Sequence, residues 1–183
     1  MALVTSSMME LGAEAPSFVL PDTVSGKPVG LPGKGEHTAT VVLFICNHCP
    51  YVHHINARLV EVANSYQAKG VRFLAISSNN VGTYPQDGPE HMARVARELG
   101  YPFPYLYDEN QEVARAYEAA CTPDLFVFDS QLACTYRGRF DPTRPNMGNA
   151  TGADLTAALD ALLEGRPVSG EQFPSMGCSI KWK

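Results

Sequence analysis

The sequence has no long apolar run and few basic residues, and each of these shortages excludes a class of protein. No stretch approaches the roughly 18 consecutive apolar residues that a membrane-spanning helix needs. Lys and Arg number 14 against 19 Asp and Glu, and the net charge of −5 argues against a surface that binds nucleic acid. Charged residues make up 18% of the 183 residues and apolar residues 45%, a balance that excludes intrinsic disorder. We therefore expect neither a membrane nor a nucleic-acid partner.

Cysteines are also scarce, and their odd number, five, does not suit a disulfide framework in a chain of this length. Residues 1–12 have no cationic segment followed by an apolar one, so no secretory signal is predicted. We expect a cytoplasmic protein, in which thiols stay reduced unless they are catalytic or bind metal. The length predicts one domain over residues 1–183, with residues 166–183 as a C-terminal tail.

The order of apolar runs and helical patterns predicts an α/β fold. Two β-branched runs are typical of buried strands, and the helical spacing between them predicts a βαβ unit with parallel strands. The predicted strands are 38–45, 71–77, 125–129 and 132–138, the helices are 51–69, 90–99, 111–117 and 153–163, and a small hairpin lies within 12–31. We expect a mixed central sheet with helices on both faces and an N-terminal β-hairpin extension.

Two other segments are predicted to contain no regular strand. The aromatic residues of 101–107 lie in a stretch interrupted by prolines and are interpreted as core and loop packing. The long polar segment 79–89 is interpreted as a loop that either borders a partner groove or simply crosses the surface.

The junction between the first strong strand and its helix carries the residues best suited to chemistry. Cys49 stands where the helix is expected to begin, just before Pro50. Unpaired N–H groups and the helix dipole stabilise an anion at such a position, which favours a nucleophilic thiolate. Cys46 lies three residues earlier, a spacing found in redox Cys-x-x-Cys pairs and equally in metal half-sites.

This junction and its surroundings resemble the thioredoxin-like superfamily, and within it the redoxin branch of the AhpC/TSA type, over about residues 12–165. The segment 12–20 is similar to the entry hairpin of that branch. The string Cys46–Val52 and the tail segment 177–182 resemble the subgroup called peroxiredoxin-like 1. The resemblance implies a thioredoxin-like α/β fold and a thiol–disulfide oxidoreductase, with antioxidant peroxidase activity as a related possibility.

The resemblance also implies roles for a second loop. Thr122-Pro123 looks like the loop that carries a cis-proline in this fold, where the backbone before the proline pairs with a substrate disulfide. That loop packs against the helix that carries the nucleophile, so Cys121 is expected near Cys49. Cys49 is then the catalytic nucleophile, Cys121 and Cys46 are candidate resolving thiols, and Thr122 and Pro123 shape the substrate loop. Reducing equivalents come from protein or small-molecule thiols, so no bound cofactor is implied.

Two departures from the family pattern bear on the reaction. Counted from Phe44, the second cysteine of thioredoxin falls on Val52, so Cys46 and Cys49 form a displaced pair. The peroxidatic signature Pro-x-x-x-Thr/Ser-x-x-Cys is absent, because Val42 and Cys46 occupy its first two defined positions. A divergent peroxidase that uses peroxide and the same Cys49 is therefore the alternative rather than the first choice.

A copper or zinc carrier is the second alternative, because three histidines lie beside the two cysteines. His48, His53 and His54 provide imidazole ligands near Cys46 and Cys49. Neighbouring residues on a helix point about 100° apart, so His53 and His54 are not expected to share one ion. We assign no metal, and we interpret His48 either as a group that tunes the thiols by stabilising a thiolate when protonated or as a solvent-facing loop residue.

The remaining cysteines have no predicted catalytic role. Cys134 lies on a hairpin strand and is interpreted as an inert core residue. Cys178 lies in the tail, where an inert residue, part of a lid and a third thiol are all open interpretations.

Overall fold

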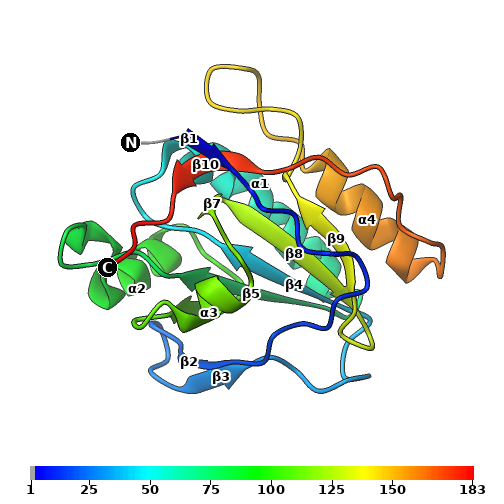
Figure 1. Ribbon diagram of the computed structural model, residues 1–183, viewed down its shortest axis with the longest axis horizontal. Helices are drawn as coiled ribbons and strands as arrows, with labels where there is room; N and C mark the ends of the chain where they lie inside the picture. The colour runs from blue at the N-terminus through cyan, green and yellow to red at the C-terminus, as the bar shows by residue number, and fades with distance from the viewer. Residues whose placement is uncertain (1–2) are drawn as a thin grey trace.

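A five-stranded mixed sheet forms the centre of the computed structural model, which describes residues 3–183 (Figure 1). The strand order is β6-β5-β4-β8-β9. The first three of these strands run parallel, and β8 is antiparallel to both β4 and β9. The strands span Ala39–Phe44 (β4), Val71–Ser77 (β5), Tyr105–Tyr107 (β6), Asp124–Asp129 (β8) and Cys134–Gly138 (β9).

Helices cover both faces of this sheet, as the sequence predicts. Helices α1 (Pro50–Gln67), α2 (Pro89–Glu98) and α4 (Ala153–Leu163) contribute to the apolar cluster on one face. Helix α3 (Glu112–Ala116) packs on the other face with the hairpin of β2 (Val19–Pro21) and β3 (Pro28–Gly30). No helix within residues 3–183 has the length and apolarity needed to cross a membrane.

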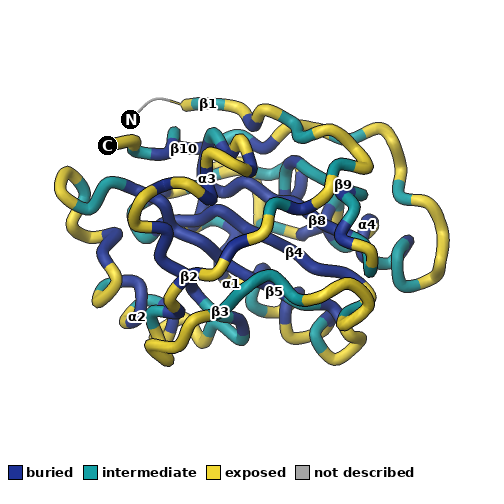
Figure 2. Tube along the Cα trace, turned by 60° about the horizontal axis from the view of Figure 1, so that its bottom comes forward, coloured by how far each residue is buried: buried dark blue, intermediate teal, exposed yellow. Residues whose placement is uncertain are grey.

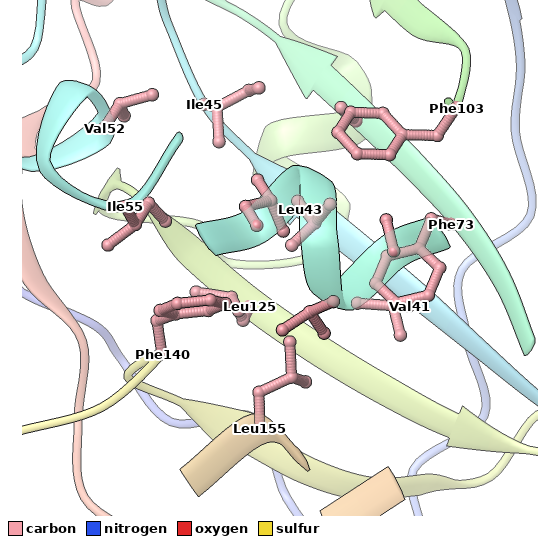
Figure 3. Close-up of a cluster of buried hydrophobic side chains, with 14 of the residues drawn as sticks. Val41, Leu43, Ile45, Val52, Ile55, Phe73, Phe103, Leu125, Phe140 and Leu155 are labelled. Carbon is pink, nitrogen blue, oxygen red and sulfur yellow. The ribbon is translucent and has the colours of Figure 1, made fainter. Parts of the chain in front are cut away.

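Strand β4 is buried on both faces, which explains its nearly continuous apolar sequence. Val41 and Leu43 belong to the cluster under α1, where Figure 3 shows them near Leu155 of α4. Val42 and Phe44 belong to the cluster on the α3 side. Figure 2 shows the same arrangement, with buried central strands and exposed connecting loops. The strand therefore ends inside the molecule, and the residues that follow it begin in a buried setting.

The predicted strands and helices are present, but the aromatic stretch, predicted to contain no strand, contains one. The aromatic stretch includes β6, a short edge strand that pairs in parallel with β5. The polar loop includes the 3-10 turn η1 (Pro85–Asp87). The interpretation of the aromatic residues as core packing is confirmed for Phe103, Tyr105 and Tyr107, which are buried. Strand β6 was missed because its pairing partner lies about 30 residues earlier, beyond any local pattern.

Strands near the two ends of the chain join β7 (Cys121–Thr122) in a separate three-stranded sheet. Strand β10 (Met176–Ser179) lies between β1 (Leu3–Thr5) and β7, and both pairings are antiparallel. Figure 1 shows the red C-terminal segment beside the blue N-terminal one. The tail that the sequence left without structure is therefore a central strand of this sheet, and it lies against the predicted substrate loop.

Candidate active site

Cys49 is the residue that precedes the first turn of α1. It has extended backbone dihedrals, Pro50 occupies the first helical position, and its carbonyl accepts hydrogen bonds from the N–H groups of Val52 and His53. Proline suits this position because its missing N–H is one that the helix leaves unpaired. The Cys49 side chain has no exposed surface. Its sulfur therefore lies at the positive end of an 18-residue helix, shielded from water.

Two residues from distant parts of the chain and one neighbouring cysteine surround the Cys49 sulfur. Its Sγ lies 3.0 Å from the Sγ of Cys178 and 3.1 Å from the carbonyl oxygen of Thr122. Cys46 belongs to the same cluster, since its Sγ lies 3.4 Å from the Thr122 hydroxyl. The site thus joins the end of β4, the start of α1, strand β7 and strand β10.

This environment favours one thiolate among several thiols. The pKa of Cys49 is lowered to about 4, chiefly by a hydrogen bond from Cys46, against the opposing effect of burial and with help from Cys178 and the Thr122 side chain. The pKa of Cys46 is raised, because it serves as that donor and is itself buried. Burial and the neighbouring Cys49 raise the pKa of Cys178 to about 12. At neutral pH, Cys49 therefore carries the charge and its neighbours carry protons.

The loop predicted to contact substrate lies against this cluster. The Thr122–Pro123 peptide bond is cis, as the resemblance implies. Cys121 is buried, and its sulfur lies 3.6 Å from the carbonyl oxygen of Pro123. Burial raises its pKa, with a smaller contribution from Asp124, so Cys121 also holds its proton. Sequence reasoning placed Cys49, Cys46 and Thr122 at one site, and the structure brings these three together.

Asp124 follows the loop and is fully buried. Burial raises the pKa of its carboxyl to about 8. Its Oδ2 accepts a hydrogen bond from the N–H of Ala120, whereas its Oδ1 has no partner among residues 3–183. The carboxyl is therefore largely protonated at neutral pH.

Sequence reasoning missed Asp87, which organises the other side of the site. This fully buried residue of η1 accepts hydrogen bonds from the N–H of Asn47 and the amide of Asn79, both at 2.8 Å. Its other close partner is His48, whose Nδ1 lies 2.6 Å from Oδ2. The His48 ring also stacks on Tyr84. No local signal marks Asp87, because the His48 that it holds lies 39 residues earlier in the chain.

Within residues 3–183, one group of side chains has donor atoms of the kinds that bind metal ions. The donor atoms of Cys46, His48 and Asp87 all lie within 4.8 Å of one another. His53 and His54 instead form hydrogen bonds to groups outside this cluster. A metal ion held there would take the Cys46 sulfur as a thiolate, with the His48 imidazole and the Asp87 carboxylate as its other ligands.

Two openings of different size lie beside the cluster. One, of about 520 Å³, is lined by Cys46, His53 and Tyr101 among others, and a smaller one, of about 100 Å³, is lined by Tyr51, Pro123 and Met176 among others. Typical ligand pockets have volumes of about 300–1,000 Å³. Because Cys49 itself is fully buried, its sulfur is closed off in this conformation.

Comparison with known proteins identifies a family that this chain matches and solved structures that share its fold. Residues 11–137 match the model of the AhpC/TSA family. Among the curated proteins, no sequence matches this chain significantly.

Several solved structures are similar over most of their length. An uncharacterized conserved protein from Geobacillus kaustophilus is 58% identical, with a TM-score of 0.97 over 100% of this chain and 97% of the other. A hypothetical protein from Sinorhizobium meliloti 1021 is 43% identical, with a TM-score of 0.94 over 98% of both chains. Peroxidoxin BcpB from Mycobacterium tuberculosis is 19% identical, with a TM-score of 0.63 over 86% of this chain and 98% of the other. At that lower identity the likeness shows the fold, which is thioredoxin-like.

Proposed function

The chain belongs to the AhpC/TSA family, and from this we propose that it is a thiol–disulfide oxidoreductase with Cys49 as its nucleophile. Membership of the family supports redox chemistry at a thiol. One observation carries the more specific proposal: Cys49 has a strongly lowered pKa at the start of α1 and lies beside the carbonyl oxygen of Thr122. A thiolate held next to an extended backbone segment is suited to attack a disulfide in a polypeptide.

The reaction begins when the Cys49 thiolate attacks one sulfur of a substrate disulfide. A bond forms between that sulfur and Cys49, and the other half of the substrate leaves as a thiolate that takes up a proton. A second thiol then attacks the mixed disulfide and releases the rest of the substrate. Cys46 and Cys121 were the candidates from the sequence, and both carry protons in this site. Thr122 and Pro123 would shape the substrate loop, and the chemistry requires thiols alone, without a bound cofactor.

Peroxide is the competing substrate for the same thiolate. Cys49 would attack one peroxide oxygen and become a sulfenic acid, and water would leave. Position 46 carries a thiol where the peroxidatic signature has a hydroxyl, and that thiol has Thr122 and Cys49 as partners. We place disulfide reduction first because the substrate loop lies against the nucleophile, an arrangement that peroxide does not require.

A comparison of the two substrates tests this proposal. Reduced, reductant-free protein is mixed with equal concentrations of either a disulfide-linked dimer of a short cysteine peptide or hydrogen peroxide, and loss of protein thiols is followed over time. We expect the peptide disulfide to oxidise the protein faster than peroxide does. Faster oxidation by peroxide would favour the peroxidase, and no oxidation by either substrate would refute both redox proposals.

A further inference from the structure

We propose that β10 occupies the position beside β7 that an extended segment of a substrate would take. We also propose that Cys178 is the thiol that resolves the mixed disulfide on Cys49. This inference rests on the proposed function, because a resolving thiol is needed only if Cys49 forms such an intermediate. It assigns the role of the second thiol to Cys178, for which three interpretations were open from the sequence. It also defines the substrate as a disulfide-bonded cysteine within an extended polypeptide segment.

The register of β10 places Cys178 in the position of a substrate cysteine. Strand β10 pairs in antiparallel fashion with β7, and Cys178 lies directly opposite Thr122. The carbonyl oxygen of Thr122 contacts the Cys49 sulfur, so a cysteine opposite Thr122 is held beside the nucleophile. The two sulfur atoms are 3.0 Å apart, about 1 Å more than a disulfide bond. A small movement therefore suffices for bond formation.

Gly177, the residue before Cys178, is what allows β10 to approach β7 so closely. A Cβ atom at Gly177 would lie 2.0 Å from the carbonyl oxygen of Thr122 and 2.7 Å from its carbonyl carbon. Both atoms belong to the backbone, so no side-chain rotation relieves the overlap. Only glycine at position 177 allows β10 to lie this close to β7.

The same strand closes the site to an outside polypeptide. Cys49 is fully buried, so an outside polypeptide cannot reach its sulfur while β10 is in place. The edge of β7 that would pair with a substrate strand is already paired with β10. A substrate segment must therefore take the place of β10, adding a strand to β7 as extended peptides do at exposed sheet edges. The tail and the substrate compete for one edge.

This competition gives the order of events. With β10 displaced, Cys49 attacks the substrate disulfide and one substrate thiol leaves. When β10 returns, the Cys178 thiol loses its proton and attacks Cys49 Sγ. The bond between Cys49 and the substrate breaks, the second substrate thiol leaves and takes up a proton, and the Cys49–Cys178 disulfide forms. Two thiols of this chain are thus oxidised and one substrate disulfide is reduced. An external dithiol must then reduce the chain for the next turnover.

Peptide release and disulfide mapping test the inference together. Reduced wild-type protein is mixed with one equivalent of the disulfide-linked peptide dimer, released peptide thiols are counted, and protein disulfides are identified by mass spectrometry. We expect two peptide thiols per chain and a Cys49–Cys178 disulfide. Cys178→Ser should release one peptide thiol and keep the other peptide bound to Cys49. Cys134→Ser is the matched control, since Cys134 is equally buried but packs on the opposite face of the sheet, and it should behave as wild type.

The outcomes separate this inference from the proposed function. A disulfide from Cys49 to Cys46 or Cys121 in wild type would overturn the role of Cys178 and leave the oxidoreductase intact. So would release of two peptide thiols by Cys178→Ser. If wild type releases no peptide thiol, both proposals fail. The disulfides identified in the oxidised wild-type protein show which thiol pairs with Cys49, even if Cys178→Ser does not fold.

Discussion

Replacing Cys49 by serine is expected to lower the rate of peptide-disulfide reduction by at least about a thousandfold, the scale on which loss of a catalytic nucleophile acts. Cys49 is the residue whose pKa is lowered to about 4, whereas its thiol neighbours have raised values. A serine hydroxyl stays protonated at neutral pH and forms no disulfide, so the variant lacks the nucleophile at the start of α1. Initial rates of peptide thiol release measure the effect.

The control for this variant is another cysteine that is buried but remote from the site. Cys134 has 2% exposure and packs on the opposite face of the sheet from Cys49. Cys134→Ser should retain nearly full activity, and circular dichroism should show that both variants are folded. If folded Cys49→Ser keeps more than about a tenth of the wild-type rate, Cys49 is not the nucleophile and the proposed reaction is wrong.

Replacing Gly177 by alanine is expected to move β10 away from β7 and expose Cys49. The added Cβ would lie 2.0 Å from the Thr122 carbonyl oxygen, and the backbone cannot remove that overlap without a shift of the strand. Overpacking of this kind typically costs about 1–3 kcal/mol in the free energy of unfolding. Cys49 becomes exposed when β10 moves, so its alkylation by iodoacetamide should become at least about tenfold faster. That factor corresponds to a decrease of about 1.4 kcal/mol in the free energy needed to displace β10 from β7.

Gly170 provides the matched control within the same tail. A Cβ at Gly170 would meet no atom within 4 Å, so Gly170→Ala should match wild type in both stability and Cys49 alkylation. Urea unfolding and mass-spectrometric rates of alkylation compare the two variants. Equal behaviour of Gly177→Ala and Gly170→Ala would show that the contact between β10 and β7 does not control access to the nucleophile.

The part of the site that could be predicted from the sequence is the part built from neighbouring residues. Strand β4 ends in a buried run, Pro50 opens α1, and Cys49 stands between them, so local patterns place a thiol at a helix start. The resemblance adds the Thr122–Pro123 loop, which the structure places against that thiol. These predictions rely on short-range signals and a shared motif, and neither requires knowledge of how distant segments pair.

The parts that could not be predicted depend on contacts between residues far apart in the chain. Cys178 reaches Cys49 across 129 positions because β10 enters a sheet with β1 and β7. Asp87 lies in a polar segment typical of a surface loop, and its burial becomes evident only beside His48. The need for glycine at position 177 likewise appears only when the backbone of Thr122 is placed next to it. Strand pairing sets the positions of Cys178 and Gly177, and packing of η1 against the segment after β4 buries Asp87. No local pattern specifies either contact.

Titration of the Cys49 thiolate by its ultraviolet absorbance tests most directly whether this residue is the activated nucleophile. The absorbance of Cys49→Ser is subtracted from that of wild type at each pH, so the difference reports the one sulfur. Because the pKa is lowered, the thiolate signal should appear as the pH rises through about 4 and should be constant by neutral pH. A difference signal that appears only near or above the ordinary cysteine pKa of about 8.5 would contradict the activation of Cys49.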